Sequence, residues 1–142
     1  LEPTLEMAKV CGANLLLYRV VQPVLRPSYI PEGSTLVSLT HSVLEQINQL
    51  QQQKQSEAQA YLNQVAEELR KRGFSVQTCV GVDEEPSVGI LLESQAKHVD
   101  LIAMETHARR GVSRLLRGSV ADKIVRGGTI PVFMHHPVPS NG

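Results

Sequence analysis

Short, nearly continuous apolar runs alternate along this chain with stretches of helical periodicity, and no other feature constrains the fold as strongly. Such runs are typical of strands buried on both faces, as in parallel sheets. The helical stretches between them end at glycines or begin at a proline. Strands are expected at residues 13–21, 74–80, 99–104 and 130–134, and helices at 1–11, 41–72, 86–97 and 119–126. This alternation predicts an α/β fold with a doubly wound parallel sheet.

The length of 142 residues predicts one domain, at residues 1–138, followed by a tail at 139–142. The charges balance, with 14 Lys and Arg against 14 Asp and Glu, so the chain lacks the positive charge typical of nucleic-acid binding. Its apolar runs are far shorter than the ~20 residues that a membrane span needs. We therefore expect no nucleic-acid or membrane partner.

The two cysteines, Cys11 and Cys79, form neither a disulfide framework nor a zinc pattern. This usage fits a reducing compartment, and we expect a cytoplasmic protein. Both cysteines are expected to be small buried apolar side chains.

The predicted helix at 41–72 is longer than a domain of this size can cover. Its glutamine-rich part, 46–59, has few apolar anchors. This part could project, fray or pack on another subunit, but a solvated polar face is the simpler interpretation. The preceding segment, 22–40, contains three prolines and a glycine and is expected to be a long loop.

A candidate ligand-binding segment follows the strand expected at 99–104. Ligands of α/β sheets bind at the carboxyl ends of strands. Gly118 and Ser119 stand where the next helix begins, and such a position offers backbone N–H groups, a hydroxyl and the positive end of a helix dipole to a phosphate. Four arginines, at 109, 110, 114 and 117, add positive charge. Taken alone, this spacing fits Ser119 as a helix N-cap and the arginines as a solvated face better than a binding site.

The sequence of the C-terminal part resembles a universal stress protein domain. The resemblance is carried by 100–104, Thr106-His107, 118–126 and 130–132; it is close over 99–134 and looser over 1–98. It implies a five-stranded parallel sheet in the order 3-2-1-4-5, with helices on both faces. It also implies ATP binding through Gly-x2-Gly-x9-Gly-Ser/Thr, and dimerisation through the last strand, both of which are found in many members.

Carried onto this chain, the third glycine of that pattern is Gly118, whereas the first two positions hold Glu105 and Ala108. The Glu105 carboxylate could accept hydrogen bonds from hydroxyls but repels a polyphosphate, and Ala108 adds a methyl group. Val20 matches an apolar position that contacts adenine. The nucleotide-binding residues implied by the resemblance are Val20, Met104, Glu105, Thr106, His107, Ala108, Arg109, Gly118, Ser119 and Val120.

Three functional classes follow. The first is a stress-response binding module for ATP or another adenine nucleotide, with or without Mg²⁺. The second is a homodimeric stress protein that binds no nucleotide and acts through protein partners. The third is an enzyme that catalyses slow ATP hydrolysis or a related adenylyl-transfer reaction. The sequence shows no general base or metal ligand for either reaction, so no catalytic or metal residues are assigned. His135 and His136 are a poor metal pair because adjacent strand residues point to opposite faces.

The family pattern begins with a strand to which nothing in this sequence corresponds. In the order 3-2-1-4-5 this strand is central, and its loss would leave unpaired backbone groups at about 1–3 kcal/mol each. We therefore expect the first strand to be absent from this sequence and to lie upstream of Leu1. Direct pairing of 13–21 with 99–104 would contradict this expectation. The last strand, Ile130 to His135, would be an exposed apolar edge and is expected to form a homodimer.

Overall fold

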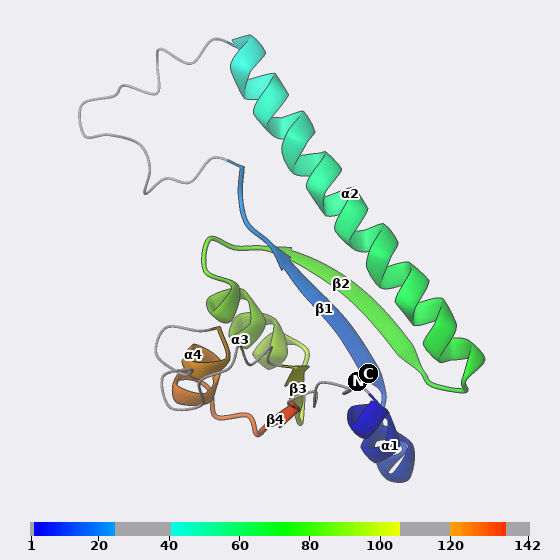
Figure 1. The fold of residues 1–142 in the computed structure, drawn as a ribbon. Coiled ribbons are helices and arrows are strands. Elements are labelled where there is room, and N and C mark those ends of the chain that lie inside the picture. The colour runs from blue at the N-terminus through cyan, green and yellow to red at the C-terminus, as the bar shows by residue number, and fades with distance from the viewer. Residues whose placement is uncertain (1, 25–40, 106–119, 136–142) are drawn as a thin grey trace, which may run out of the picture. The chain divides into compact units, whose positions relative to one another are not determined.

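A computed structural model describes residues 2–24, 41–105 and 120–135 (Figure 1). The chain divides into two compact units, one comprising Leu1–Leu15 and Ser87–Gly142 and the other Leu16–Pro86. The elements are α1 (Glu2–Cys11), β1 (Leu15–Val21), α2 (His41–Lys71), β2 (Val76–Val82), α3 (Pro86–Ala96), β3 (Ile102–Glu105), α4 (Val120–Gly127) and β4 (Val132–His135). The predicted alternation of helices and strands is therefore confirmed in the part of the chain that the structure describes. None of the helices described there is both long and apolar enough to cross a membrane.

Three helices end in a residue with left-handed backbone conformation. Gly12 and Gly73 have φ values of 62° and 91° after α1 and α2. Beyond α2, the N–H of Gly73 donates to the carbonyl of Arg70 and that of Phe74 to the carbonyl of Leu69, so the last carbonyls are satisfied. His98, with φ 51°, takes the same place after α3. The preference for glycine at helix ends therefore predicts two of these ends, whereas a histidine stands at the third.

In the unit of residues 16–86, β1 pairs with β2 and α2 packs on β2. Tyr18 of β1 lies over Gly81 of β2 so closely that an added Cβ at Gly81 would overlap the tyrosine hydroxyl and ring. This glycine is therefore needed to let the side chain cross the neighbouring strand. The N–H of Asp83, the residue after β2, donates to the carbonyl of Val21, the last residue of β1, at 3.3 Å. This bond extends the contact between the two strands past the end of β2.

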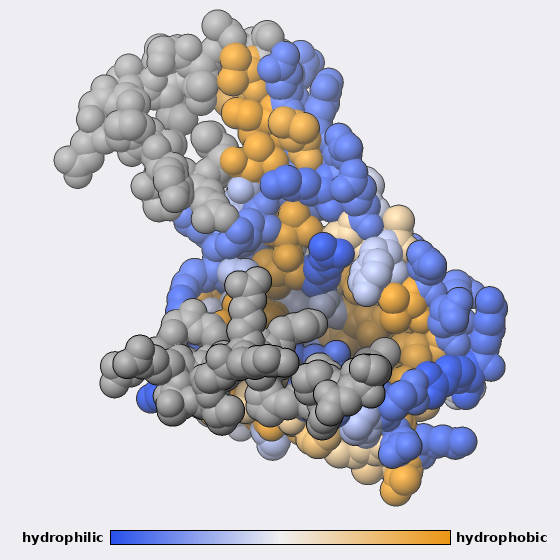
Figure 2. Space-filling view, in the orientation of Figure 1, coloured by the Kyte–Doolittle hydropathy of each residue, from blue (hydrophilic) through white to orange (hydrophobic). Residues whose placement is uncertain are grey.

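The C-terminal part of α2 packs through one apolar face. Ala58, Leu62, Ala66 and Leu69 are buried and recur at four- and three-residue spacing, as expected for one face of a helix. No residue from 43 to 57 is buried. Hydrophobic residues are nevertheless visible on one side of the N-terminal part of α2 (Figure 2); Val43, Leu44 and Leu50 are all exposed.

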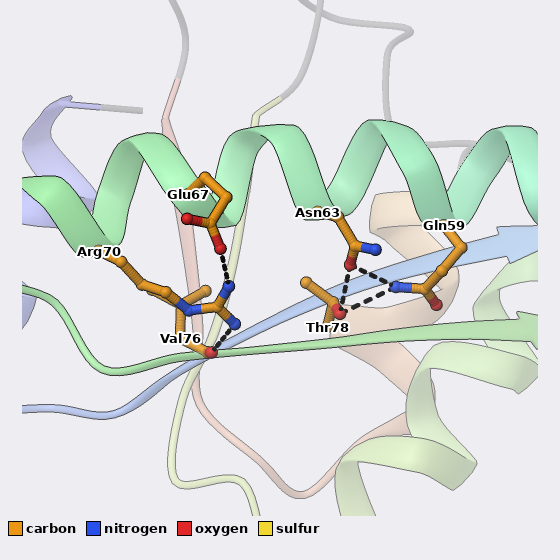
Figure 3. A network of polar contacts seen from close by, with 6 residues as sticks. All are labelled: Gln59, Asn63, Glu67, Arg70, Val76 and Thr78. Atoms are coloured by element: carbon orange, nitrogen blue, oxygen red, sulfur yellow. Dashed lines mark hydrogen bonds and ion pairs between the residues drawn. The ribbon is translucent and has the colours of Figure 1, made fainter.

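Polar groups accompany this packing along α2 and β2 (Figure 3). The Gln59 amide donates to Thr78 Oγ1 at 2.9 Å and to Asn63 Oδ1 at 2.8 Å. The Thr78 hydroxyl donates to the same Asn63 oxygen at 3.1 Å. These bonds close a three-residue network in which each side chain fixes the other two.

Arg70 forms a second polar link between α2 and β2. Its Nη2 donates to the carbonyl of Val76 at 2.6 Å, and its Nη1 pairs with Glu67 at 2.7 Å (Figure 3). The guanidinium thus joins the last turns of the helix to the first residue of the strand.

In the other unit, β3 and β4 are parallel, with Ile102 opposite Val132 and Glu105 opposite His135. Ile102 is buried, as are Ala121 and Ile124 of α4. Leu91 of α3 lies against the glycines that end α4, with an ideal Cβ at Gly128 falling 2.8 Å from its Cδ2. Together with Leu5 and Ala8 of α1, the buried residues Ile102, Ala121 and Ile124 belong to the core of this unit.

Two predictions about burial are wrong. The segments 13–21 and 99–104 were expected to be strands buried on both faces, but no residue of β1 is buried, and Ala103 and Glu105 of β3 are exposed. The reason is that burial depends on which elements cover the two faces of a strand, and an apolar run alone does not specify them. Cys11 is exposed at the end of α1 and Cys79 is half-buried, so the expectation that both are buried is also wrong.

Within the described residues, β1 pairs with β2 and β3 pairs with β4.

Candidate functional site

The carboxyl ends of β3 and β4 lie side by side. In the parallel register, Met104 is opposite Met134 and Glu105 is opposite His135. Glu105 and His135 are the last residues of their strands. In parallel α/β sheets, ligands bind beyond this end of the strands.

Glu105 and His135 form a polar pair across the ladder. His135 Nδ1 lies 3.4 Å from Glu105 Oε1, and the side chains are 28% and 37% exposed, respectively. His135 Nδ1 is enclosed and makes no well-aligned hydrogen bond within the described part. The pair becomes an ion pair when the imidazole is protonated, and its exposure to water limits its contribution to stability.

The helix that follows β3 in the described part, α4, begins at Val120, whose side chain is 38% exposed. Asp122 lies in its first turn, and its Oδ1 accepts a hydrogen bond from Arg126 Nε at 2.7 Å. This bond raises the pKa of Arg126 above its ordinary value. The carboxylate in the first turn is thus paired within the helix.

The predicted nucleotide-binding residues are only partly covered by the structure. Met104 is half-buried and adjacent to exposed Glu105 at the end of β3, and Val120 is the first residue of α4. Val20 is half-buried in β1, in the other compact unit. Thr106, His107, Ala108, Arg109, Gly118 and Ser119 lie outside the described residues.

Sequence reasoning missed His135 as the partner of Glu105. The histidine was considered only together with His136, which lies outside the described part, as a metal pair. The available signal was the expected parallel pairing of neighbouring strands, because strands that end at the same edge place their last residues together. Within the described ranges, no group of three or more His, Cys, Asp or Glu residues could hold a metal ion.

These elements define an α/β protein with parallel strands and helices. Residues 1–136 match the Universal stress protein family. The chain belongs to this family.

Individual relatives agree with this assignment. The chain is 29% identical over 101 residues to universal stress protein MJ0577 of Methanocaldococcus jannaschii, covering 70% of this chain and 60% of the relative. It is 29% identical over 107 residues to universal stress protein MJ0531 of the same organism, covering 75% of this chain and 61% of the relative. The matched part therefore spans about three-fifths of these curated relatives.

Two solved structures share the fold. The structure of MJ0577 that served to assign its biochemical function superposes with a TM-score of 0.67 at 22% identity, covering 98% of this chain and 89% of that one. A universal stress family protein from Burkholderia pseudomallei gives a TM-score of 0.60 at 21% identity, covering 94% and 82% of the two chains. At these identities the likeness concerns the fold.

Proposed function

We propose that this universal stress family protein is a stress-response binding module for an adenine nucleotide. The observation that carries the proposal is the position of segment 106–119 in the chain: it follows Glu105, at the carboxyl end of parallel strand β3, and precedes Val120, at the start of α4. A connection from a strand end to a helix N-terminus is the usual position for phosphate recognition in α/β proteins.

Each residue of the proposed site has a role. Gly118, Ser119 and Val120 hold the phosphates, Val20 contacts the base, and residues 106–109 flank the ribose and phosphates, next to Met104 and Glu105. Mg²⁺ can accompany the phosphates of the bound nucleotide.

Calorimetric titration of the full chain with ATP, ADP, AMP and cyclic nucleotides tests the proposal. A Ser119→Ala variant should weaken binding roughly 10- to 100-fold, because a hydrogen bond to a charged group is lost. Ser56→Ala, on the exposed surface of α2, is the matched control and should leave binding unchanged. Absence of binding to every nucleotide would refute the proposal.

We also propose that the two strand pairs belong to one five-stranded sheet in the order 3-2-1-4-5, with a central strand between β1 and β3. In this order, strands 2, 3, 4 and 5 correspond to β1, β2, β3 and β4. In support, leaving out the central strand 1 gives the two observed pairs, β1–β2 and β3–β4. In a chain that carries this central strand, cross-strand backbone contacts measured by NMR should link both β1 and β3 to it, and direct contacts between β1 and β3 would contradict the proposal.

A second candidate is a cytoplasmic homodimer that acts through protein partners. It is favoured by β4, which pairs only with β3 in the described part and holds half-buried Phe133 and Met134 near an open edge. Light scattering at micromolar concentration should give twice the monomer mass, and Phe133→Lys should reduce it to that of a monomer. A monomeric unmodified chain would contradict this candidate.

A further inference from the structure

We infer that the outer edge of β2 and the groove beside it bind an extended segment of a partner polypeptide, which adds to β2 as a further strand. The outer edge of β2 is the edge that does not pair with β1. The bound segment carries hydroxyl or amide side chains, such as those of threonine, at alternate positions. This inference depends neither on nucleotide binding nor on a homodimer through β4.

The composition of β2 is that of an unprotected edge strand. β1 pairs with one of its edges, and no strand in the described part pairs with the other. Edge strands are usually protected by lysine, by proline or by short length, because their N–H and C=O groups otherwise pair with another chain. β2 has seven residues, none of which is charged or proline, and four of them are valine or threonine. Such β-branched residues favour strand pairing.

A groove of about 500 Å³ between α2 and β2 is lined by Gln55, Ser56, Gln59, Ala60, Asn63 and Val80. Arg19 of β1 lies over the ring of Tyr61 at 5.6 Å, so the Tyr61 side of α2 faces β1. Gln59 and Asn63 are about 160° from Tyr61 around the helix. Both form hydrogen bonds with Thr78 of β2 (Figure 3). The groove therefore lies beside the outer edge of β2, on the side of α2 away from β1.

The groove offers neutral hydrogen-bonding groups. Its polar lining consists of amides and a hydroxyl, which both donate and accept, and none of its lining residues is charged. Arg70, on the same side of α2, donates from Nη2 to the carbonyl of Val76 at 2.6 Å, so a carbonyl of β2 already accepts a bond from this side. Backbone groups of alternate strand residues point to the same edge, so those of Thr78 and Val80 face the groove as well. An added strand thus finds backbone partners on β2 and side-chain partners on α2.

The packing of α2 decides between a peptide and a second copy of this chain. α2 packs on β2 itself. Antiparallel pairing of β2 with β2 of a second copy would place two α2 helices over adjacent strands, about 4.8 Å apart, whereas packed helices need about 8–10 Å. A strand that carries no helix on this face avoids the collision. The occupant is therefore an extended segment of another polypeptide.

NMR titration of the full chain with a blocked heptapeptide, in which threonine alternates with lysine and glutamate, tests the inference. The backbone amide signals of Thr78 and Val80 should shift, with half-saturation below about 1 mM. Two N-methylated forms of the peptide are the backbone controls, one methylated at the threonines and the other at the charged residues. An added strand bonds through only one of its edges, so one form should bind at least ~10-fold more weakly and the other nearly as well as the parent peptide.

Ser56→Trp fills the groove from the exposed surface of α2 and should weaken binding of the parent peptide at least ~10-fold. Ala60→Trp fills it from a second exposed position and should have the same effect. Glu68→Trp is the matched control, because it places the same side chain on an exposed position of α2 outside the groove and should leave binding unchanged. Circular dichroism shows that each variant keeps the fold.

Absence of binding by the unmodified chain would overturn the inference. Equal binding of the two N-methylated peptides, or unchanged binding by both groove variants, would overturn it as well. Light scattering tests the other occupant: a dimer that Ser56→Trp dissociates and Phe133→Lys leaves intact would show that a second copy occupies this edge, which would overturn the assignment to a partner polypeptide.

Discussion

The two parts of α2 have the same secondary structure but opposite surroundings. From 58 to 71, the helix buries Ala58, Leu62, Ala66 and Leu69 and is tied by polar bonds to β2. From 43 to 57, no residue is buried, and Leu50 is 50% exposed. A continuous helix thus contains a packed part and an exposed part.

Length explains this difference. At ~1.5 Å per residue, the 31 residues of α2 extend about 46 Å, whereas β2 has seven residues and spans about 23 Å. The strand can cover only about half of the helix. Good helix formers such as glutamine and local bonds such as that from Gln53 to Glu57 at 2.9 Å stabilise the exposed part. One tertiary hydrogen bond also reaches it, from the Val24 N–H to Gln51 Oε1 at 2.8 Å.

Removing a packed side chain should have the largest effect. Leu62→Ala should lower the free energy of unfolding by about 2–5 kcal/mol, because it removes buried methyl groups and leaves a cavity. Urea denaturation followed by circular dichroism measures this change. A nearby exposed position provides a control, since Gln64→Ala should change stability by no more than about 0.5 kcal/mol. Equal effects at the two positions would show that this part of α2 is not the packed one.

Amide hydrogen exchange measures the same contrast without mutation. We expect residues 58–71 to exchange at least ~10-fold more slowly than 43–57, a difference of about 1.4 kcal/mol in opening free energy. The physical reason is that a helix segment with little tertiary packing is only marginally stable in water, and segment 43–57 contains no buried residue. Uniform protection along α2 would contradict the division into packed and exposed parts.

The polar network of the packed part should contribute less than its apolar face. Thr78→Val removes the hydroxyl that accepts from Gln59 and donates to Asn63, and should cost about 1 kcal/mol. Thr78→Ser keeps the hydroxyl and is the control for its hydrogen bonds. In denaturant titrations, Thr78→Val should lower the free energy of unfolding by less than Leu62→Ala does. The opposite order would mean that polar bonds contribute more than apolar packing to the contact between α2 and β2.

Most of the fold could be predicted because its signals are local. Helix ends at Gly12 and Gly73 follow from the freedom of glycine to adopt positive φ. The end of α3 uses His98 in this conformation, which residue type alone does not signal. Strand boundaries were less accurate: the strand expected at 74–80 is Val76–Val82, and that at 99–104 is Ile102–Glu105. Those boundaries depend on pairing with distant segments.

Burial and the site were harder to predict because they depend on neighbours. An apolar run such as 15–21 indicates a strand, but its burial depends on which elements cover it. Glu105 was identified as a candidate because it takes the place of the first glycine in the family's nucleotide-binding pattern, whereas its contact with His135 depends on the register of β3 and β4. Nothing in the local sequence of either residue specifies that register.

The smallest effect is expected at the exposed part of α2. Leu50→Ala should change the free energy of unfolding by no more than about 0.5 kcal/mol, because a side chain that is already half exposed loses little burial and alanine is a good helix former. It removes the same atoms as Leu62→Ala, so the two variants form a matched pair within one helix, measured by the same urea titration. A cost above about 1 kcal/mol at Leu50 would mean that this side chain packs against a surface beyond the described residues. Both parts of α2 would then be packed, and they would differ in the surface against which each of them packs.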